Sequence, residues 1–134
     1  MDWKLALAVL GAGVVASFTD WLFMGVLFHE RYNKYPEIWW PQFREKGDSR
    51  AILYSTALGF ITSAAVIGLC LMLGTSDLKS ALTVALLAWI AGPLVVTITN
   101  GIWIKIDPAV TFAHCLGYLA RFLIAGVAAS IVLG

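Results

Sequence analysis

Five polar side chains within apolar stretches are the residues best suited to chemistry. Asp20 lies inside SFTDWLF, and Asn100 belongs to another apolar run. His114, Tyr118 and Arg121 follow one another at i, i+4 and i+7 in a third run, a spacing that places all three on one face of a helix. Ionisable side chains in such segments mark ion, proton or ligand sites. We therefore expect these five residues to form a polar cluster that binds a small ligand or a proton.

The charges of Asp20 and Arg121 predict an ion pair. An isolated charge in hydrocarbon costs at least about 2.5–3.5 kcal/mol, and these two charges have opposite signs. Pairing offsets much of the cost that either would incur alone. Three interpretations stay open: a structural pair that fixes helix register, a site for an ion, proton or polar head group, and a catalytic site in which His114 and Asp20 act as acid and base.

Other chemistries find little support in the sequence. No spacing resembles HExxH or paired CxxC, so we predict no metal site, and no phosphate loop or nucleophile elbow is present. The cofactor is therefore unknown, and a non-enzymatic role is favoured. Cys70 and Cys115 are expected near opposite membrane faces, too far apart for a disulfide. A net charge of +1 offers no footprint for a nucleic acid.

The composition indicates an integral membrane protein. Of 134 residues, 60% are hydrophobic and 13% are charged, and the mean hydropathy is +0.86. A membrane-spanning helix needs about 20 apolar residues. Four runs meet this length: Leu5–Phe28, Ala51–Gly74, Ala81–Ile104 and Ala109–Leu133. The predicted fold is all-α, a single transmembrane domain over residues 1–134, built as an antiparallel bundle of helices at about 4–29, 50–74, 80–105 and 108–133.

The loop 30–49 is expected to lie on the cytoplasmic membrane surface. It is rich in aromatic residues, which favour the headgroup level, and Pro36 and Pro41 prevent one continuous helix. Trp39 and Trp40 are either interfacial anchors or a lid over the polar cluster. The loop also carries four Lys and Arg residues, and Arg50 follows it directly. This excess predicts a bacterial inner-membrane protein with both termini outside.

The two halves of the chain resemble each other. Ser17–Asp20 aligns with Thr97–Asn100, and Leu58–Ile61 aligns with Leu116–Leu119, with small and polar residues in register. The alignment predicts two repeated helical hairpins that run in the same direction across the membrane. A chance likeness between apolar segments is the alternative.

The segment from Asp107 to His114 and the aromatic residues Trp21 and Phe28 carry a family resemblance. Together they resemble a family of small bacterial four-helix membrane proteins known as a domain of unknown function. The resemblance covers nearly the whole chain. It implies the four-helix fold and leaves the activity open.

Three classes of function fit these observations. A binding or transport protein makes most use of the predicted repeat, the polar cluster and the helix break expected at Pro93. An accessory or structural subunit of a larger membrane complex needs only helix packing, and a small intramembrane enzyme is the third reading. The expected partners are membrane lipid and a second copy of the chain in a homodimer.

Overall fold

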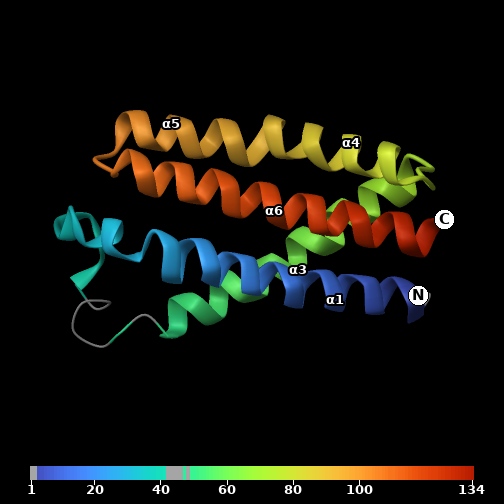
Figure 1. Cartoon of the computed structure of the whole chain (residues 1–134), viewed down its shortest axis with the longest axis horizontal. Helices are drawn as coiled ribbons and strands as arrows, with labels where there is room; N and C mark the ends of the chain where they lie inside the picture. Colours follow the sequence, from blue (N-terminus) through green and yellow to red (C-terminus); the bar gives the residue numbers. More distant parts are fainter. Residues whose placement is uncertain (1–2, 42–46, 48) are drawn as a thin grey trace.

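The computed structural model describes residues 3–41, 47 and 49–134. Within them, four helices are long and apolar enough to cross a membrane: Trp3–Leu27, Ser49–Met72, Leu78–Trp103 and Pro108–Leu133. They alternate in direction, so the two chain ends lie at the same end of the bundle (Figure 1). The predicted all-α fold with four membrane-spanning helices is confirmed. The remainder of the predicted 30–49 loop, at 42–46 and 48, lies outside the described residues.

The first span changes its helical form directly after Asp20. The α-helix α1 covers Trp3–Asp20, and the π-helical segment η1 covers Trp21–Leu27. Two short 3-10 helices follow, η2 at His29–Asn33 and η3 at Pro36–Ile38. Wide π-helical turns inside α-helices are rare and frequently lie at functional sites. Asp20 thus lies at the junction between regular helix and a widened helical segment.

The third span contains a second π-helical segment. It consists of α4 (Leu78–Trp89), η4 (Ile90–Leu94) and α5 (Val95–Trp103). Pro93 lies inside η4, where its missing N–H removes one helical hydrogen bond and the helix accommodates this by widening locally. The break predicted at Pro93 is therefore a π-helical segment within one continuous rod (Figure 1).

The last helix, α6 (Pro108–Leu133), is the centre of the bundle. It packs against α1, α4 and the second span, α3 (Ser49–Met72), and α3 crosses the other helices obliquely (Figure 1). Small side chains fill these contacts: Ala12, Ala16, Ser63, Ala81, Ala85, Ala113, Ala125 and Ala129 are all buried. Small residues let helix backbones approach closely in a membrane.

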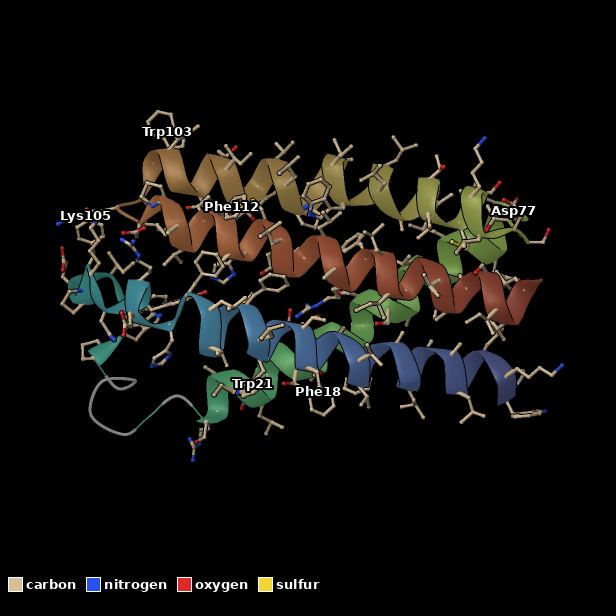
Figure 2. All side chains as sticks on the ribbon, in the orientation of Figure 1. Phe18, Trp21, Asp77, Trp103, Lys105 and Phe112 are labelled. Atoms are coloured by element: carbon tan, nitrogen blue, oxygen red, sulfur yellow. The ribbon has the colours of Figure 1, made fainter. Side chains whose placement is uncertain are left out.

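The outer surface of the bundle is apolar. Phe18, Trp21, Trp103 and Phe112 are each more than half exposed, and Figure 2 shows apolar side chains along the outside of the helices. A soluble domain would bury such residues, whereas a bilayer solvates them. Together with the four long apolar helices, this surface identifies an integral membrane protein.

Candidate functional site

Asp20 and Arg121 form the centre of the candidate site. Asp20 is the last residue of α1, and the Arg121 Nη2 donates a hydrogen bond to the Asp20 Oδ2, which makes a charge pair between α1 and α6. Arg121 is 6% exposed, and the Asp20 side chain is 18% exposed. These two opposite charges are thus adjacent and largely shielded from the surroundings.

Two glycines make room for this pair. A Cβ atom at Gly117 of α6 would lie 3.5 Å from the Asp20 Oδ1 and 3.1 Å from the Met24 Cε. A Cβ atom at Gly59 of α3 would lie 3.5 Å from the Arg121 Cζ. The carboxylate and the guanidinium therefore lie against bare backbone of α6 and α3, respectively. A Cβ atom at either position would be in ordinary van der Waals contact with the charged group, and at Gly117 it would also crowd Met24.

The pair leaves hydrogen-bonding capacity unused. The Asp20 Oδ1 and the Arg121 Nε are buried and have no hydrogen-bond partner among the described residues. The Asp20 Oδ1 is an acceptor and the Arg121 Nε carries a donor N–H, so each member of the ion pair has one unused position. Buried polar atoms normally have a partner, and an exception calls for a specific explanation. A water-sized molecule that accepts a hydrogen bond from the Arg121 Nε and donates one to the Asp20 Oδ1 would supply one.

Aromatic residues continue the site from Arg121 toward the loop. The Arg121 Cζ lies 5.5 Å from the centre of the Tyr118 ring, within the range of a cation–π contact. The Tyr118 and His114 rings are 6.0 Å apart, and the His114 Nε2 shares a hydrogen bond of 3.0 Å with the Tyr32 Oη. The helical spacing brings His114, Tyr118 and Arg121 together on α6. Tyr32 extends this row beyond the membrane span.

Tyr32 is a site residue that sequence reasoning missed. It lies in η2, and burial raises the pKa of its phenol above the ordinary value. Its contact with His114 spans 82 positions of the chain, so no local spacing in the sequence reveals it. The aromatic content of the loop was the one available signal, and that signal did not distinguish Tyr32 from its neighbours.

The two tryptophans proposed as a lid differ in position. The Trp39 Nε1 donates a hydrogen bond of 2.8 Å to the Tyr32 carbonyl oxygen, and the Trp39 and Tyr32 rings are 5.7 Å apart. Trp40 is 70% exposed and has no hydrogen bond or ring contact with another described residue. Trp39 therefore supports Tyr32 from the loop side, whereas Trp40 lies away from the cluster.

Asn100 does not join the cluster, which corrects its predicted place there. It is exposed on α5, and its side chain bonds to no described residue. The neighbouring Gly101 faces α6 instead, because a Cβ atom there would lie 2.8 Å from the Thr111 Oγ1. The rotation of α5 about its axis therefore turns Asn100 outward.

Charged residues join the loop to the connection between α5 and α6. The Lys34 Nζ lies 2.8 Å from the Asp107 Oδ2, and the Lys105 Nζ lies 2.6 Å from the Glu37 Oε1. The Tyr35 ring contacts both cations, with its centre 5.3 Å from the Lys34 Nζ and 4.5 Å from the Lys105 Nζ. These five residues, which we call the latch, hold η2 and η3 against the end of the bundle.

Asp107 has two functions in this arrangement. Its Oδ1 accepts a hydrogen bond of 2.7 Å from the Ala109 N–H at the start of α6, which is a helix cap. The ion pair with Lys34 and the hydrogen bond from the Ala109 N–H hold the pKa of the Asp107 carboxyl below its ordinary value. The same pairing raises the pKa of Lys34. Asp107 is fixed by α6, so the loop is attached to a rigid point.

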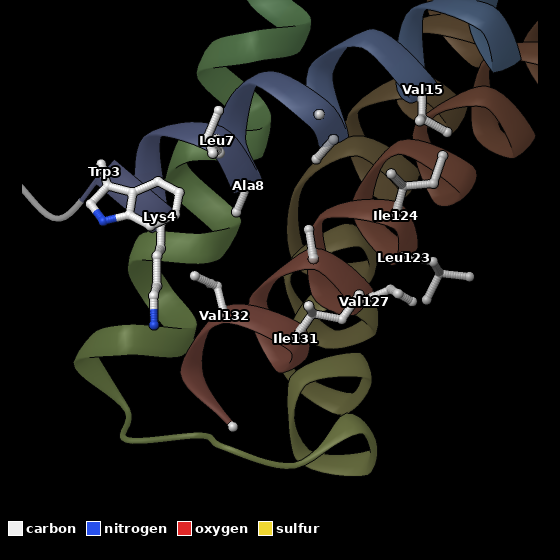
Figure 3. Close-up of a pocket in the computed structure, with 14 residues that line it drawn as sticks. Trp3, Lys4, Leu7, Ala8, Val15, Leu123, Ile124, Val127, Ile131 and Val132 are labelled. Carbon is white, nitrogen blue, oxygen red and sulfur yellow. The ribbon is translucent and has the colours of Figure 1, made fainter.

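Two surface hollows lie away from the polar cluster. An apolar groove of about 940 Å³ runs between α1 and α6, from Trp3 and Lys4 at one end to Val15 and Leu123 near mid-bundle (Figure 3). A second hollow of about 490 Å³ between α1 and α3 includes Phe18. Neither hollow is lined by Asp20, His114, Tyr118 or Arg121.

Metal and thiol chemistry have no visible centre in the described part of the chain. No group of three or more His, Cys, Asp or Glu side chains among these residues is placed to hold a metal ion. Cys70 and Cys115 are free and buried. His114 contacts Tyr32 and Tyr118, and no contact joins it to Asp20 in the acid–base pair considered for an enzyme.

Comparison with known proteins gives one match. A family model described as a protein of unknown function (DUF1761) matches residues 7–130. No curated protein and no solved structure matches the chain. The matched region contains all the residues of the polar cluster and the latch.

Proposed function

We propose that this chain, which belongs to the DUF1761 family of proteins of unknown function, binds a proton within the membrane at the Asp20–Arg121 pair. The observation that carries the proposal is the pair's unused capacity, an acceptor on Asp20 and a donor on Arg121 that are buried and unpartnered in the described structure. A small polar ligand that carries the proton, such as water, would fit the same two atoms. The two surface hollows do not reach the pair, which favours so small an occupant.

The row of residues toward the loop supports a route for the proton. Tyr32 lies in the loop and is hydrogen-bonded to His114, and histidine is the residue type whose unperturbed pKa lies nearest to neutral pH. Tyr118 lies between His114 and Arg121. In this proposal His114 accepts a proton from the loop side and passes it toward Asp20. Arg121 keeps its contact with Tyr118 when Asp20 becomes neutral, so the guanidinium retains a partner.

Infrared difference spectroscopy tests this proposal. The protein is reconstituted in lipid nanodiscs, and the carboxylic C=O stretch, which reports protonated carboxyl groups, is followed as the pH is lowered. We expect a band from a buried carboxyl that is absent in Asp20→Asn. Asn100→Ala is the matched control, because it removes a polar side chain that lies in another membrane span and outside the cluster. It should leave the band unchanged. A spectrum identical in the wild type and Asp20→Asn would overturn the proposal.

The orientation of the bundle belongs to the same proposal. The latch residues Lys34 and Lys105 lie at the bundle end opposite Asp77 and the chain ends (Figures 1 and 2). Under the positive-inside rule, the end rich in Lys and Arg faces the cytoplasm. We place both termini outside, in the inner membrane of a bacterium, so that the route from Tyr32 to Asp20 opens from the cytoplasm.

An accessory subunit of a membrane complex is the second candidate. The groove between α1 and α6 favours it, since small residues such as Gly11 and Ala12 line an apolar hollow that a partner helix could enter. In that reading the Asp20–Arg121 pair serves only to hold α1 against α6. Crosslinking in native membranes followed by purification would then recover a larger complex, and Asp20 would show no titration.

A further inference from the structure

We propose that the segment His29–Ile38 is a lid over His114. The charges of the latch hold this lid closed. Its purpose as a gate for protons rests on the proposed function, whereas its existence as a movable lid does not.

The backbone of the segment is bonded only to itself and its immediate neighbours. The N–H groups of Arg31, Lys34 and Ile38 donate to the carbonyl oxygens of Phe28, Arg31 and Tyr35, respectively. None of the backbone hydrogen bonds found in the described structure joins residues 29–38 to α5 or α6. The segment can therefore separate from the bundle without loss of any of these backbone bonds. Motion of this kind requires only that side-chain contacts break.

Two of the side-chain contacts that hold the segment are ion pairs. Lys34 pairs with Asp107 and Glu37 pairs with Lys105. The side chains of Lys105 and Glu37 are 63% and 55% exposed. Exposed pairs contribute little stability and are weakened further by salt. In the other pair, the Lys34 side chain is 47% exposed and the Asp107 side chain is 4% exposed, so salt should weaken the Lys105–Glu37 pair more than the Lys34–Asp107 pair.

The hydrogen bond between Tyr32 and His114 lies beneath the latch. The Tyr32 ring also meets the edge of the His114 ring, with centres 5.8 Å apart. At the start of the segment, the Phe28 and Phe112 rings are in edge contact at 6.3 Å, and this apolar contact stays in place when the latch opens. Phe28 is accordingly the fixed end, and release of the latch withdraws Tyr32 from His114.

The reactivity of His114 tests the lid. Diethyl pyrocarbonate modifies accessible imidazole groups, and peptide mass spectrometry measures modification of each histidine separately. His29 is exposed and serves as the reference in every sample. In the full-length protein in nanodiscs at low salt, we expect His114 to react much more slowly than His29. High salt should increase the modification rate of His114 relative to that of His29 by about fivefold. This factor corresponds to the loss of the free energy of one exposed ion pair.

Charge variants identify the latch as the cause. Lys105→Glu and Glu37→Lys should each increase the relative rate at His114 by a similar factor, because each places like charges together. The double variant Lys105→Glu/Glu37→Lys restores opposite charges and should return the rate toward the wild-type value. Both residues are exposed, so each variant should fold. Lys79→Glu, at the opposite end of the bundle, is the matched control and should have no effect.

Two results would overturn the lid. One is a relative rate at His114 that ignores both salt and the charge variants, and the other is equal reactivity of His114 and His29 in the wild type. The outcome is separable from the proton proposal. A latch-dependent rate at His114 without an Asp20 carboxyl band keeps the lid and removes the proposed function. An Asp20 carboxyl band with an invariant modification rate at His114 keeps the proposed function and removes the lid.

Discussion

Asp20 and Arg121 are 101 positions apart in the chain and form a hydrogen-bonded ion pair where α1 meets α6. Each side chain is largely buried, so each depends on the other for charge compensation. The pair also joins the helix that carries His114 and Tyr118 to the helix that ends at the π-helical segment η1. Packing of α1 on α6 and the state of the polar cluster are therefore coupled.

The first prediction concerns this coupling. Asp20→Asn leaves the Arg121 charge buried without a counter-charge, which costs about 3–5 kcal/mol when a buried pair is broken in this way. The double variant Asp20→Asn/Arg121→Gln removes both charges and should regain part of that loss. The free energy of unfolding in a denaturing detergent series gives the measurement. Equal losses in the single and double variants would show that the two side chains are not directly coupled.

The second prediction concerns helix packing at Gly13. A Cβ atom there would overlap the Phe60 ring, so Gly13→Ala forces α1 and α3 apart and should destabilise the bundle by about 1–3 kcal/mol. Gly11→Ala is the matched control on the same helix, because nothing lies within 4 Å of its Cβ position. Thermal unfolding of both variants in the same detergent compares them. A Gly13→Ala protein as stable as the Gly11→Ala protein would contradict the packing of α1 on α3.

The third prediction isolates one hydrogen bond of the site. Tyr32→Phe removes the hydroxyl that bonds to the His114 Nε2 and keeps the ring, so it should weaken closure of the lid by about 1 kcal/mol. The rate of His114 modification relative to His29 should rise by a factor of about five. Tyr54→Phe is the control, because Tyr54 is 67% exposed on α3. An unchanged rate in Tyr32→Phe would separate the phenol from protection of His114.

Hydropathy and helical periodicity account for much of what could be predicted. Long apolar runs must form helices in a bilayer because each backbone group needs a partner within its own segment, and this determines the spans. The i, i+4, i+7 spacing places His114, Tyr118 and Arg121 on one face of α6. Opposite charges in apolar runs also lead directly to Asp20 and Arg121 as partners.

The rotation of α5 and the fold of the loop could not be predicted in the same way. Both faces of α5 are apolar enough for lipid, so its sequence does not say whether Asn100 or Gly101 faces α6. Tyr32 and Asp107 meet their partners through contacts between distant parts of the chain, which no local spacing encodes. The internal repeat stays a prediction, and α6 packs more extensively than its proposed counterpart α3.

The fourth prediction concerns pH and the latch. The pairing of Lys34 with Asp107 lowers the pKa of Asp107 and raises the pKa of Lys34. The charge of Arg31 also lowers the pKa of Asp107. A carboxyl pKa that is lowered in the closed form stabilises that form at pH values above the ordinary pKa of Asp. This stabilisation is lost as the pH falls through the lowered pKa. A lysine pKa that is raised in the closed form stabilises that form at pH values below the ordinary pKa of Lys. This stabilisation is lost as the pH rises through the raised pKa.

The closed lid should thus persist from mildly acidic to mildly alkaline pH. Hydrogen exchange of peptides from the segment, corrected for the intrinsic pH dependence of exchange, measures this. We expect constant protection across the neutral range and a loss of protection in strong acid. Lys34→Gln removes the charge that stabilises the Asp107 carboxylate, so protection should fall across the neutral range and the acid-dependent loss that this pair causes should disappear. An acid limit identical in the wild type and Lys34→Gln would show that this pair does not hold the lid.

The last prediction concerns which side of the membrane carries the latch. Single cysteines are introduced at Ser76, between α3 and α4, and at Asn33, in η2, after Cys70 and Cys115 are replaced by alanine. Both positions are exposed, so a membrane-impermeant maleimide reports only the side on which each lies. If the Lys- and Arg-rich end faces the cytoplasm, Ser76→Cys labels in intact cells and Asn33→Cys labels only after permeabilisation. The opposite pattern would reverse the bundle and place the route to Asp20 on the outer face.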